Sequence, residues 1–586
     1  MRTITGFLLL AVSCGLHAQD SVLTRAMKDE MARSLKQLQL ENLDKPYFIS
    51  YRVAEQRGRN VSATFGALLH SREQSSRMLT VEVRVGGYQL DNTNFFAPFM
   101  GGTGVARMWG GTVQLPLEDD YKELRRQIWL ATDGAYKKAL EDLSKKRAAL
   151  QNKTRTDETP DLTREQPAVL SEQWPPARIV PAEMERLVKE FSALFKEMPD
   201  VAHSSVSLSV VNTATSYLNS EGFFFTRLRP SAMFLASAST QAGEGMPLHD
   251  FFAAYARSVE ELPSREQLAA RIRSIGANLK SLRAASLVEQ YNGPVLFEGQ
   301  AAAELFAQAF VPNLVATRRP LSDNPGFERY LAQAENPFVD KIGARVLPSM
   351  LSVTDNPTLA QYLNLPLAGS YRMDDEGIAG RETRLVENGI LKTLLSSRDP
   401  VRGIEHSSGS LRGQGAMPSN LIVTSEGGLS QPELRAKFLE LVKQRGREYG
   451  ILVRRLGNPA LKSQDGQSLF MFDSSSGELR VEPAILAYKV FPDGREELVR
   501  NAEIAALSAA TFKEIVAVSK EQTVYTAPFH GRAVPNFSYY MGGETSPGGP
   551  PATFVVPALL FEDLTVNKPR GEVPKPPVAM HPYFEK

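Results

Sequence analysis

The spacing of hydrophobic and polar residues divides the chain into strand-like and helix-like stretches. Residues 81–85 alternate valine with glutamate and arginine, which is typical of a half-buried strand. Between residues 121 and 150, apolar residues recur every three or four positions among Lys, Arg and Glu, which predicts one long amphipathic helix. Further strands of an antiparallel sheet are predicted over residues 47–54, 62–70, 78–90, 206–217 and 223–241, and further helices over 23–40, 184–198 and 248–282.

Beyond Leu287 the order of the predicted elements changes. A helix is predicted over the Ala-rich residues 301–315, followed by strands over 383–395, 419–424, 450–455, 485–491 and 496–499. This order predicts an α+β fold with two domains, residues 19–286 and 287–586. Loops are expected over 98–111 and 541–551, which are rich in Gly and Pro, and the charged residues 151–166 are expected to form an exposed linker or loop.

The first 18 residues have the features of a secretory signal peptide. Arg2 supplies a positive charge, residues 7–12 form an apolar run, and Ala18 ends a small-residue cleavage site. We therefore exclude residues 1–18 from the fold and expect a periplasmic or secreted protein. A lipoprotein signal with Cys14 as the lipidated residue is the less favoured alternative. No later stretch reaches the roughly 20 apolar residues that a membrane-spanning helix needs.

Composition narrows the chemistry that the mature chain could perform. Cys14 is the only cysteine, so cleavage after Ala18 leaves neither disulfides nor thiolate ligands for a metal. The chain has 67 Lys and Arg residues and 66 Asp and Glu residues, and loss of Arg2 with the leader balances them. Such a balance gives no global reason to bind nucleic acid or an anionic membrane. Stability must come from buried core, for which a hydrophobic content of 42% is sufficient.

The common catalytic motifs are absent from the sequence. Metal-binding histidines usually stand one helical turn apart, but here no mature histidine lies within five residues of another. There is no Gly-x-Ser-x-Gly elbow and no P-loop, and the glycine-rich residues 100–104 lack the strand and helix of a phosphate-binding unit. A serine hydrolase stays open, because a triad is assembled in space and leaves no spacing to read. The mature histidines are His70, His203, His249, His406, His530 and His581.

Residues 293–306 read Gly-Pro-Val-Leu-Phe-Glu-Gly-Gln-Ala-Ala-Ala-Glu-Leu-Phe. This run resembles the approach to the metal-binding helix of the TldD/PmbA metallopeptidase family, once described as modulators of DNA gyrase. Residues 374–392 resemble its strand hairpin, and residues 418–421 the segment that follows it. Residues 219–222, Asn-Ser-Glu-Gly, resemble a piece of its N-terminal domain. The resemblance implies an N-terminal antiparallel sheet with helices and a C-terminal mixed-sheet domain.

The resemblance also implies a degenerate metal site. Active members carry His-Glu-x-x-x-His on the helix, where the histidines hold zinc and the glutamate activates water, and a distant cysteine completes the site. Ala307, Gln308 and Pro312 occupy those positions here. A methyl group and a proline ring cannot bind a cation, and glutamine cannot accept a proton at neutral pH. We therefore predict no catalytic residue, no metal ligand and no cofactor in this chain, and a buried helix face that Pro312 ends or kinks.

The role implied by the resemblance is that of a zinc-free subunit. Such a subunit would bind a peptide or unfolded polypeptide as part of a homo- or heterodimer with a zinc-bearing relative, and its strand edges would hold the extended chain. Two alternatives stay open. One is an active peptidase with ligands rebuilt from other residues, such as Glu298, Glu304 or His406. The other is a standalone exported peptide-binding protein.

Overall fold

We describe the fold from a computed structural model of the chain. The structure describes residues 21–96, 112–151, 158–322, 324, 326, 336–413, 415–458, 481–529, 550–569, 573–577, 579 and 581–584. Two large sheets dominate it, one built from residues up to 256 and the other from residues after 285. Among the described residues, no helix is both long and apolar enough to cross a membrane. The fold class is α+β, as the sequence predicts.

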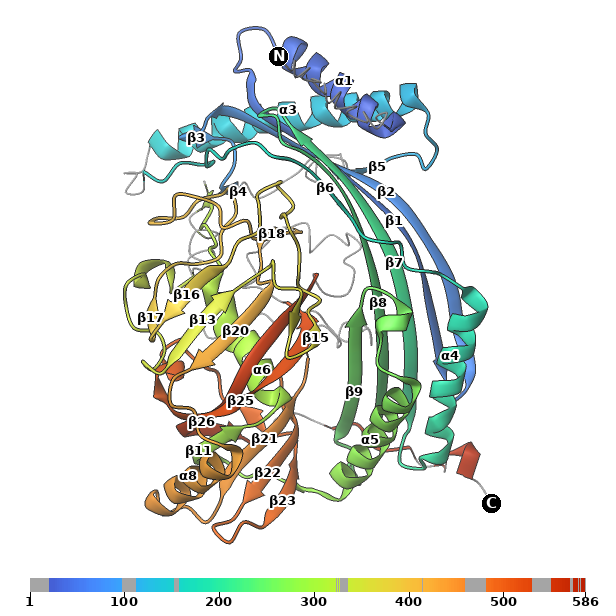
Figure 1. Ribbon diagram of the computed structural model, residues 1–586, viewed down its shortest axis with the longest axis vertical. Helices are drawn as coiled ribbons and strands as arrows, with labels where there is room; N and C mark the ends of the chain where they lie inside the picture. Colours follow the sequence, from blue (N-terminus) through green and yellow to red (C-terminus); the bar gives the residue numbers. More distant parts are fainter. Residues whose placement is uncertain are drawn as a thin grey trace, which may run out of the picture.

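Four long antiparallel strands form the body of the first sheet. They are β1 (Pro46–Thr64), β2 (Ala67–Gly87), β7 (His203–Asn219) and β8 (Phe224–Gln241), in the order β2-β1-β7-β8. Shorter strands extend both sides. These are β3 (Leu90–Asp91) and β5 (Thr112–Gln114) against β2, and β6 (Val169–Gln173) and β9 (Pro247–Ala256) against β8, of which only β6 is parallel to its neighbour. Figure 1 shows these strands as a single curved wall.

Two predicted elements of this region are right only in part. Residues 62–64 and 67–70 are strand, as predicted. The strand predicted over 62–70 contains the hairpin turn between β1 and β2, where Phe65 and Gly66 have positive φ angles of 43° and 78°. Positive φ angles favour glycine, so the Phe-Gly pair was the sequence signal for a turn at this point. The first part of the helix predicted over 248–282 is strand β9, because its backbone completes the ladder of β8. Pairing with a neighbouring strand overrides local helix preference there.

The two faces of the long sheet have different partners. In β1, the odd-numbered Tyr51, Val53, Val61 and Ala63 lie on one face and belong to the cores that the helices build. Helices cover that face. α1 (Val22–Gln37) and α3 (Tyr121–Gln151) cover one end, and α4 (Pro181–Ala193), the short η1 (Leu194–Glu197) and α5 (Arg265–Ala284) cover the other. The even-numbered Arg52 points the opposite way and donates to the Gly413 carbonyl of the C-terminal half.

The predicted exposed linker after α3 is partly wrong. Residues 152–157 lie outside the described part, but Asp161, Leu162 and Thr163 are buried. The Lys146 Nζ atom of α3 lies 2.6 Å from Asp161 Oδ2, and both side chains are almost fully buried. The charge of Asp161 therefore serves a buried ion pair. A polar sequence alone cannot show whether its charged residues are paired inside the protein or exposed to water.

The second sheet is mixed, as the resemblance implies. Its strand order is β10-β23-β22-β21-β11-β26-β20-β13-β16-β17, with β24 and β25 also paired to β26. The β11–β21, β20–β26 and β10–β23 pairs are parallel, and the others are antiparallel. The bounds are β10 (Ser286–Leu287), β11 (Tyr291–Phe297), β13 (Leu351–Asp355), β16 (Thr383–Glu387), β17 (Ile390–Leu391), β20 (Asn420–Ser425), β21 (Gly450–Leu456), β22 (Ala484–Val490), β23 (Glu496–Arg500), β24 (Glu503–Ile504), β25 (Ile515–Pro528) and β26 (Pro551–Asn567).

Smaller elements complete the C-terminal half. α8 (Gln431–Gln444) packs on the second sheet, and α6 (Gln300–Leu305) lies in its core. Two-residue strands and short 3-10 turns fill the connections. They are β4 (Phe95–Phe96), β12 (Leu321–Ser322), β14 (Gln361–Tyr362), β15 (Leu365–Pro366), β18 (Leu411–Arg412), β19 (Gly415–Ala416), η2 (Val259–Glu261), η5 (Val339–Lys341), η7 (Thr511–Glu514) and η8 (Pro582–Phe584). The C-terminal half lies on the concave side of the curved wall (Figure 1).

A buried arginine joins the two halves. Arg398 is 1% exposed, and its guanidinium donates to both carboxylate oxygens of Glu221, at 2.5 and 3.0 Å, and to the Thr163 carbonyl at 2.6 Å. Its backbone N–H donates to Glu376. Glu221 lies in the turn between β7 and β8. The two segments that resembled the family in different halves, 219–222 and 374–377, thus meet at one joint.

An exchange of Glu221 for alanine tests this joint. Glu221→Ala leaves the buried guanidinium of Arg398 and the hydroxyl of Tyr88, which donates to Glu221 at 2.6 Å, without their acceptor. We expect a loss of about 3–5 kcal/mol in the free energy of unfolding, because breaking a buried pair leaves an uncompensated charge. Urea unfolding measures it.

The matched control is Glu73→Ala. Glu73 pairs with Arg59 at 3.3 Å on the same sheet but has a side chain that is 75% exposed. Its loss should change the stability by less than about 1 kcal/mol. Equal effects of the two variants would contradict the role of the joint.

Candidate functional site

The helix that the resemblance equates with the zinc helix is irregular. α6 is followed by a π-helical turn, η3 (Phe306–Phe310), and a 3-10 turn, η4 (Val311–Leu314). Pro312 has no N–H to donate and its ring crowds the preceding turn, so a regular α-helix cannot continue through it. The predicted helix over 301–315 is confirmed as helical, with Pro312 in the turn where the helix tightens and ends. Its alanines and phenylalanines lie in the main core of the C-terminal half.

The three key positions carry no metal-binding group. Ala307 is half-buried against the core, and Pro312 is buried. Gln308 Nε2 donates to the Gly457 carbonyl at 2.9 Å, and its Oε1 accepts from the Glu482 N–H at 2.9 Å. The amide therefore connects the end of β21 with the start of the segment that leads into β22. A donor and an acceptor are both needed for this bridge, and glutamine supplies both.

Glu304 is the buried acid nearest to these positions in sequence. It is 0% exposed, and one carboxylate oxygen accepts from Gln300 Nε2 at 2.7 Å while the other accepts from the Leu456 N–H at 2.6 Å. Burial raises the pKa of Glu304 to about 7, although the nearby Arg455 guanidinium opposes the change. The carboxyl group is therefore partly protonated at neutral pH.

Polar side chains from three strands surround Glu304. Arg455 of β21 pairs with Asp250 of β9 at 2.6 Å, across the boundary between the two sheets. Asn458 Nδ2 donates to the Tyr525 hydroxyl of β25 at 3.0 Å. Burial and the charge of Glu304 raise the pKa of Tyr525 well above its ordinary value, so its hydroxyl stays protonated. The sequence analysis missed these residues because they lie on separate strands that only the fold brings together.

The alternative metal ligands do not gather at one place. Glu298 faces Arg454 at 3.6 Å, Glu304 is enclosed as described, and His406 lies 3.6 Å from Glu165. Throughout the described ranges, no group of three His, Cys, Asp or Glu side chains could hold a metal ion. The His581 ring contacts the Phe65 ring at a tilt, with the ring centres 5.3 Å apart. Of the other histidines, His203 begins β7, His249 lies in β9, and His530 lies outside the described residues. Residues 100–104 also lie outside them.

One serine and one histidine do meet on the first sheet. Ser62 Oγ lies 3.0 Å from His70 Nδ1, and His70 Nε2 lies 2.6 Å from Asn60 Oδ1. The order of groups is that of a nucleophile, a base and an orienting residue. However, β1 pairs with β2 and β7 on both sides at Ser62, so its backbone is engaged in the ladder and offers no oxyanion hole. We interpret this network as structural.

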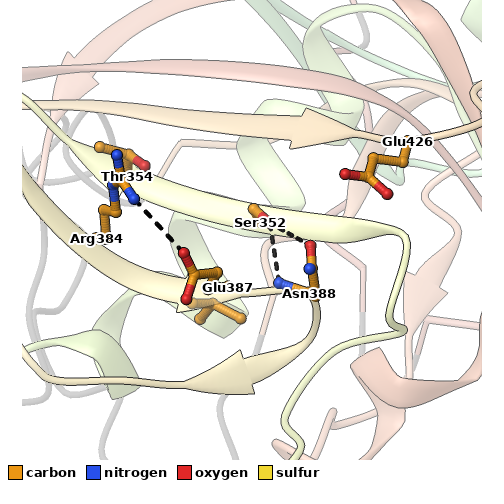
Figure 2. A pocket seen from close by; sticks show the side chains of 7 residues that line it. Ser352, Thr354, Arg384, Glu387, Asn388 and Glu426 are labelled. Carbon is orange, nitrogen blue, oxygen red and sulfur yellow. Dashed lines mark hydrogen bonds and ion pairs between the residues drawn. The ribbon is translucent and has the colours of Figure 1, made fainter.

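A hollow on the second sheet is lined mainly by polar side chains, several of which bind one another. It lies over β13 and β16, and Figure 2 shows its side chains. The Ser352 hydroxyl accepts from the Asn388 N–H at 3.0 Å, and Arg384 lies 3.6 Å from Glu387. Its lining residues are Ser352, Thr354, Arg384, Val386, Glu387, Asn388 and Glu426.

The amide of Gln308 can be tested by restoring the glutamate of the active family members. In Gln308→Glu, an ionised carboxylate faces the Gly457 carbonyl and can no longer donate. We expect a loss of about 1–3 kcal/mol in the free energy of unfolding at pH 8. The loss should shrink toward pH 5, because a protonated carboxyl donates again. Urea unfolding of the wild type, Gln308→Glu and the uncharged control Gln308→Met at both pH values measures this, and a pH-independent loss would argue against the bridge.

The raised pKa of Glu304 predicts an unusual pH dependence. The folded pKa of about 7 lies above the ordinary 4.5, so between these values the folded chain keeps a proton that the unfolded chain loses. Stability from this group therefore falls as the pH rises from about 4.5 to 7. Glu304→Gln should be more stable than the wild type at pH 8, by up to about 3 kcal/mol from about 1.4 kcal/mol per pKa unit. Thermal melts should give similar stabilities at pH 5, and a constant difference would contradict the assignment.

Comparisons with known proteins agree with this geometry. Residues 290–568 match the PmbA/TldA metallopeptidase C-terminal domain. A metalloprotease of Methanothermobacter thermautotrophicus is 27% identical over 162 residues, covering 27% of this chain and 32% of the relative. A metalloprotease of Methanocaldococcus jannaschii is 43% identical over 67 residues, covering 11% and 14%. The matches thus span less than a third of each relative's length.

Solved structures extend the likeness to the whole fold. TldE from Thermococcus kodakarensis has a TM-score of 0.55 at 17% identity and covers 92% of this chain and 100% of that one. A Thermotoga maritima protein described as a candidate modulator of a DNA gyrase has a TM-score of 0.57 at 16% identity, covering 92% and 99%. At these low sequence identities, the comparison shows only that the fold is shared. The domain match over residues 290–568 supports the TldD/PmbA family for this chain, and the solved structures show that the shared fold covers 92% of it.

Proposed function

We propose that this chain is an exported, zinc-free subunit that binds peptides for a zinc-bearing relative. The observation that carries the proposal is the hydrogen bonding of the Gln308 side chain. At the position where the resemblance places the glutamate that activates water, both polar atoms of the side chain bind the backbone of this chain. The residue serves the fold, and an amide is not a general base at neutral pH.

The donor set does not fit zinc. Catalytic zinc needs three protein ligands of the His, Asp, Glu or Cys type and an open position. Ala307 and Pro312 offer no donor atom, and the sequence has no cysteine after Cys14. We therefore derive no chemical step through a metal in this chain, and assign the cleavage step to a partner that carries the full motif.

Peptide binding is supported by the architecture of the first sheet. β6 pairs with β8 alone among the described strands, so its outer edge has backbone groups that an extended chain could join. Val169 at the start of this strand is 73% exposed. Main-chain pairing of this kind accepts many sequences, which suits a protein that handles peptides. The export part of the proposal rests on residues 1–18.

Metal analysis tests the proposal directly. The purified mature chain should contain less than about one zinc per ten molecules by mass spectrometry, and it should not cleave a fluorogenic peptide library, because its three helix positions lack donors. Stoichiometric zinc with cleavage that a chelator abolishes would establish the alternative of rebuilt ligands. A metal-free protein that neither cleaves nor binds the library would contradict the peptide-binding role.

Reconstitution separates a subunit from a standalone binding protein. The chain is added to a purified exported relative with an intact His-Glu-x-x-x-His motif from the same organism. Faster cleavage than by the relative alone supports a subunit. Unchanged cleavage with preserved peptide binding by the chain supports the standalone binding protein. The control is the same experiment with Glu221→Ala, in which the joint that holds the two halves is weakened.

A further inference from the structure

One end of the molecule carries a local excess of positive charge. The helices α1 and α3 together contain twelve Lys and Arg residues and six Asp and Glu residues, a net charge of +6. Lys146 pairs inward with Asp161, and the other residues of the two helices still carry a net +5. The mature chain as a whole is balanced, so its remaining residues carry a net −6. A charge separation of this kind attracts a charged partner to one part of the surface.

The two helices form one continuous surface. They lie side by side at one end of the curved wall (Figure 1), and their buried sides pack on the same core. The Arg125 guanidinium of α3 lies 3.0 Å from the Glu30 carboxylate of α1, and Arg33 of α1 lies over the Trp129 ring of α3 at 5.9 Å. The exposed sides of both helices are therefore available to a single partner.

Two large apolar side chains are exposed within this basic surface. Trp129 is 44% exposed and Leu130 is 50% exposed. Leu130 follows Arg126 by four residues and precedes Lys137 by seven, so these three side chains lie on the same side of the helix. Basic side chains around an apolar centre are typical of helices that lie in a membrane interface. There, Lys and Arg meet anionic headgroups, and Trp and Leu enter the boundary of the acyl chains.

The apolar centre favours a lipid surface over nucleic acid. Lys and Arg can bind the phosphates of either partner, but a nucleic acid backbone offers no apolar region for Leu130. The position of the helices in the chain also favours a membrane. α1 begins at Val22, four residues after the predicted cleavage site at Ala18 and eight after Cys14. In either reading of the leader, this end of the mature chain is the one next to the membrane that the leader enters.

We infer that α1 and α3 form a binding surface for an anionic lipid bilayer, with their basic side chains on the headgroups and Trp129 and Leu130 in the interface. This role goes beyond the proposed peptide-binding function and needs neither peptide nor metal. It keeps the chain at a membrane surface without a spanning segment.

Sedimentation with lipid vesicles tests the surface. The mature chain is mixed with phosphatidylcholine vesicles that contain about one third phosphatidylglycerol, or none. Binding should require the anionic lipid and should weaken more than about tenfold between about 0.05 and 0.5 M salt, because salt screens charges at a surface. Tryptophan fluorescence should shift to shorter wavelength on binding, and Trp129→Phe should remove that shift.

Two charge reversals at matched positions locate the surface. Lys137 of α3 is 56% exposed and pairs with Asp133, and Lys437 of α8 is 40% exposed and pairs with Glu440. Replacement of either lysine by glutamate changes the net charge equally and keeps a good helix former. Lys137→Glu should weaken vesicle binding about tenfold, and Lys437→Glu less than about twofold. Leu130→Gln keeps the charge and should weaken binding about fivefold. All three should melt close to the wild type, because these side chains are exposed.

The opposite results overturn the inference. No sedimentation with anionic vesicles identifies a solvated helix surface. Equal losses in the two lysine variants show that the net charge of the chain acts, rather than this surface. Wild-type binding by Leu130→Gln, or binding of duplex DNA as tight as that of the vesicles, identifies a general affinity for polyanions and overturns the bilayer as the partner. None of these results depends on zinc or on peptide binding, so the proposed function is tested separately.

Discussion

The two-sided pairing of the long β1, β2, β7 and β8 strands is the constraint on which the rest of the structure depends. In a strand, successive side chains point to opposite faces, so one continuous ladder presents one face to the helices and the other to the C-terminal half. Tyr51 and Val61 lie under helices, whereas Arg52 reaches Gly413 across the opposite face. A shift of one residue in this register would exchange the two sets of side chains and separate the halves.

The halves are held together by buried charge as well as by apolar contact. Arg398 binds Glu221 and the Thr163 carbonyl, and Met373 and Ile378 pack against Phe223 and Phe225. Gly377 has a φ of 85°, and a Cβ atom there would lie 3.2 Å from the Phe223 ring. Such a joint requires fixed partners on both sides. Residues 219–222 and 374–377, which are far apart in sequence, meet there through Arg398.

The helix that the resemblance equates with the metal helix is fixed in the fold by its own contacts. Pro312 and the π-helical turn break the regular spacing of the helix, and Gln308 ties the backbone around Gly457 and Glu482. Glu304 stays buried next to Arg455 and Tyr525, with a pKa raised to about 7. Polar groups therefore still concentrate where the resemblance places the zinc.

The sequence by itself determined most of the elements and their order. Period-two and period-3.6 patterns gave the α+β class, the long helix α3, the β7–β8 hairpin and the strands of the second sheet, because such patterns need only local geometry and a buried face. The short motifs pointed to the family, and the residue types at 307, 308 and 312 led to the prediction that the chain holds no zinc. The remaining features of the fold were decided by pairing between segments that are distant in sequence. The continuity of β1, the strand β9 and the burial of Asp161 depend on partners far along the chain, and so does the ion pair of Arg455 with Asp250. Hydrogen bonds and ion pairs between distant segments leave no local period in the sequence, so only the tertiary structure could reveal them.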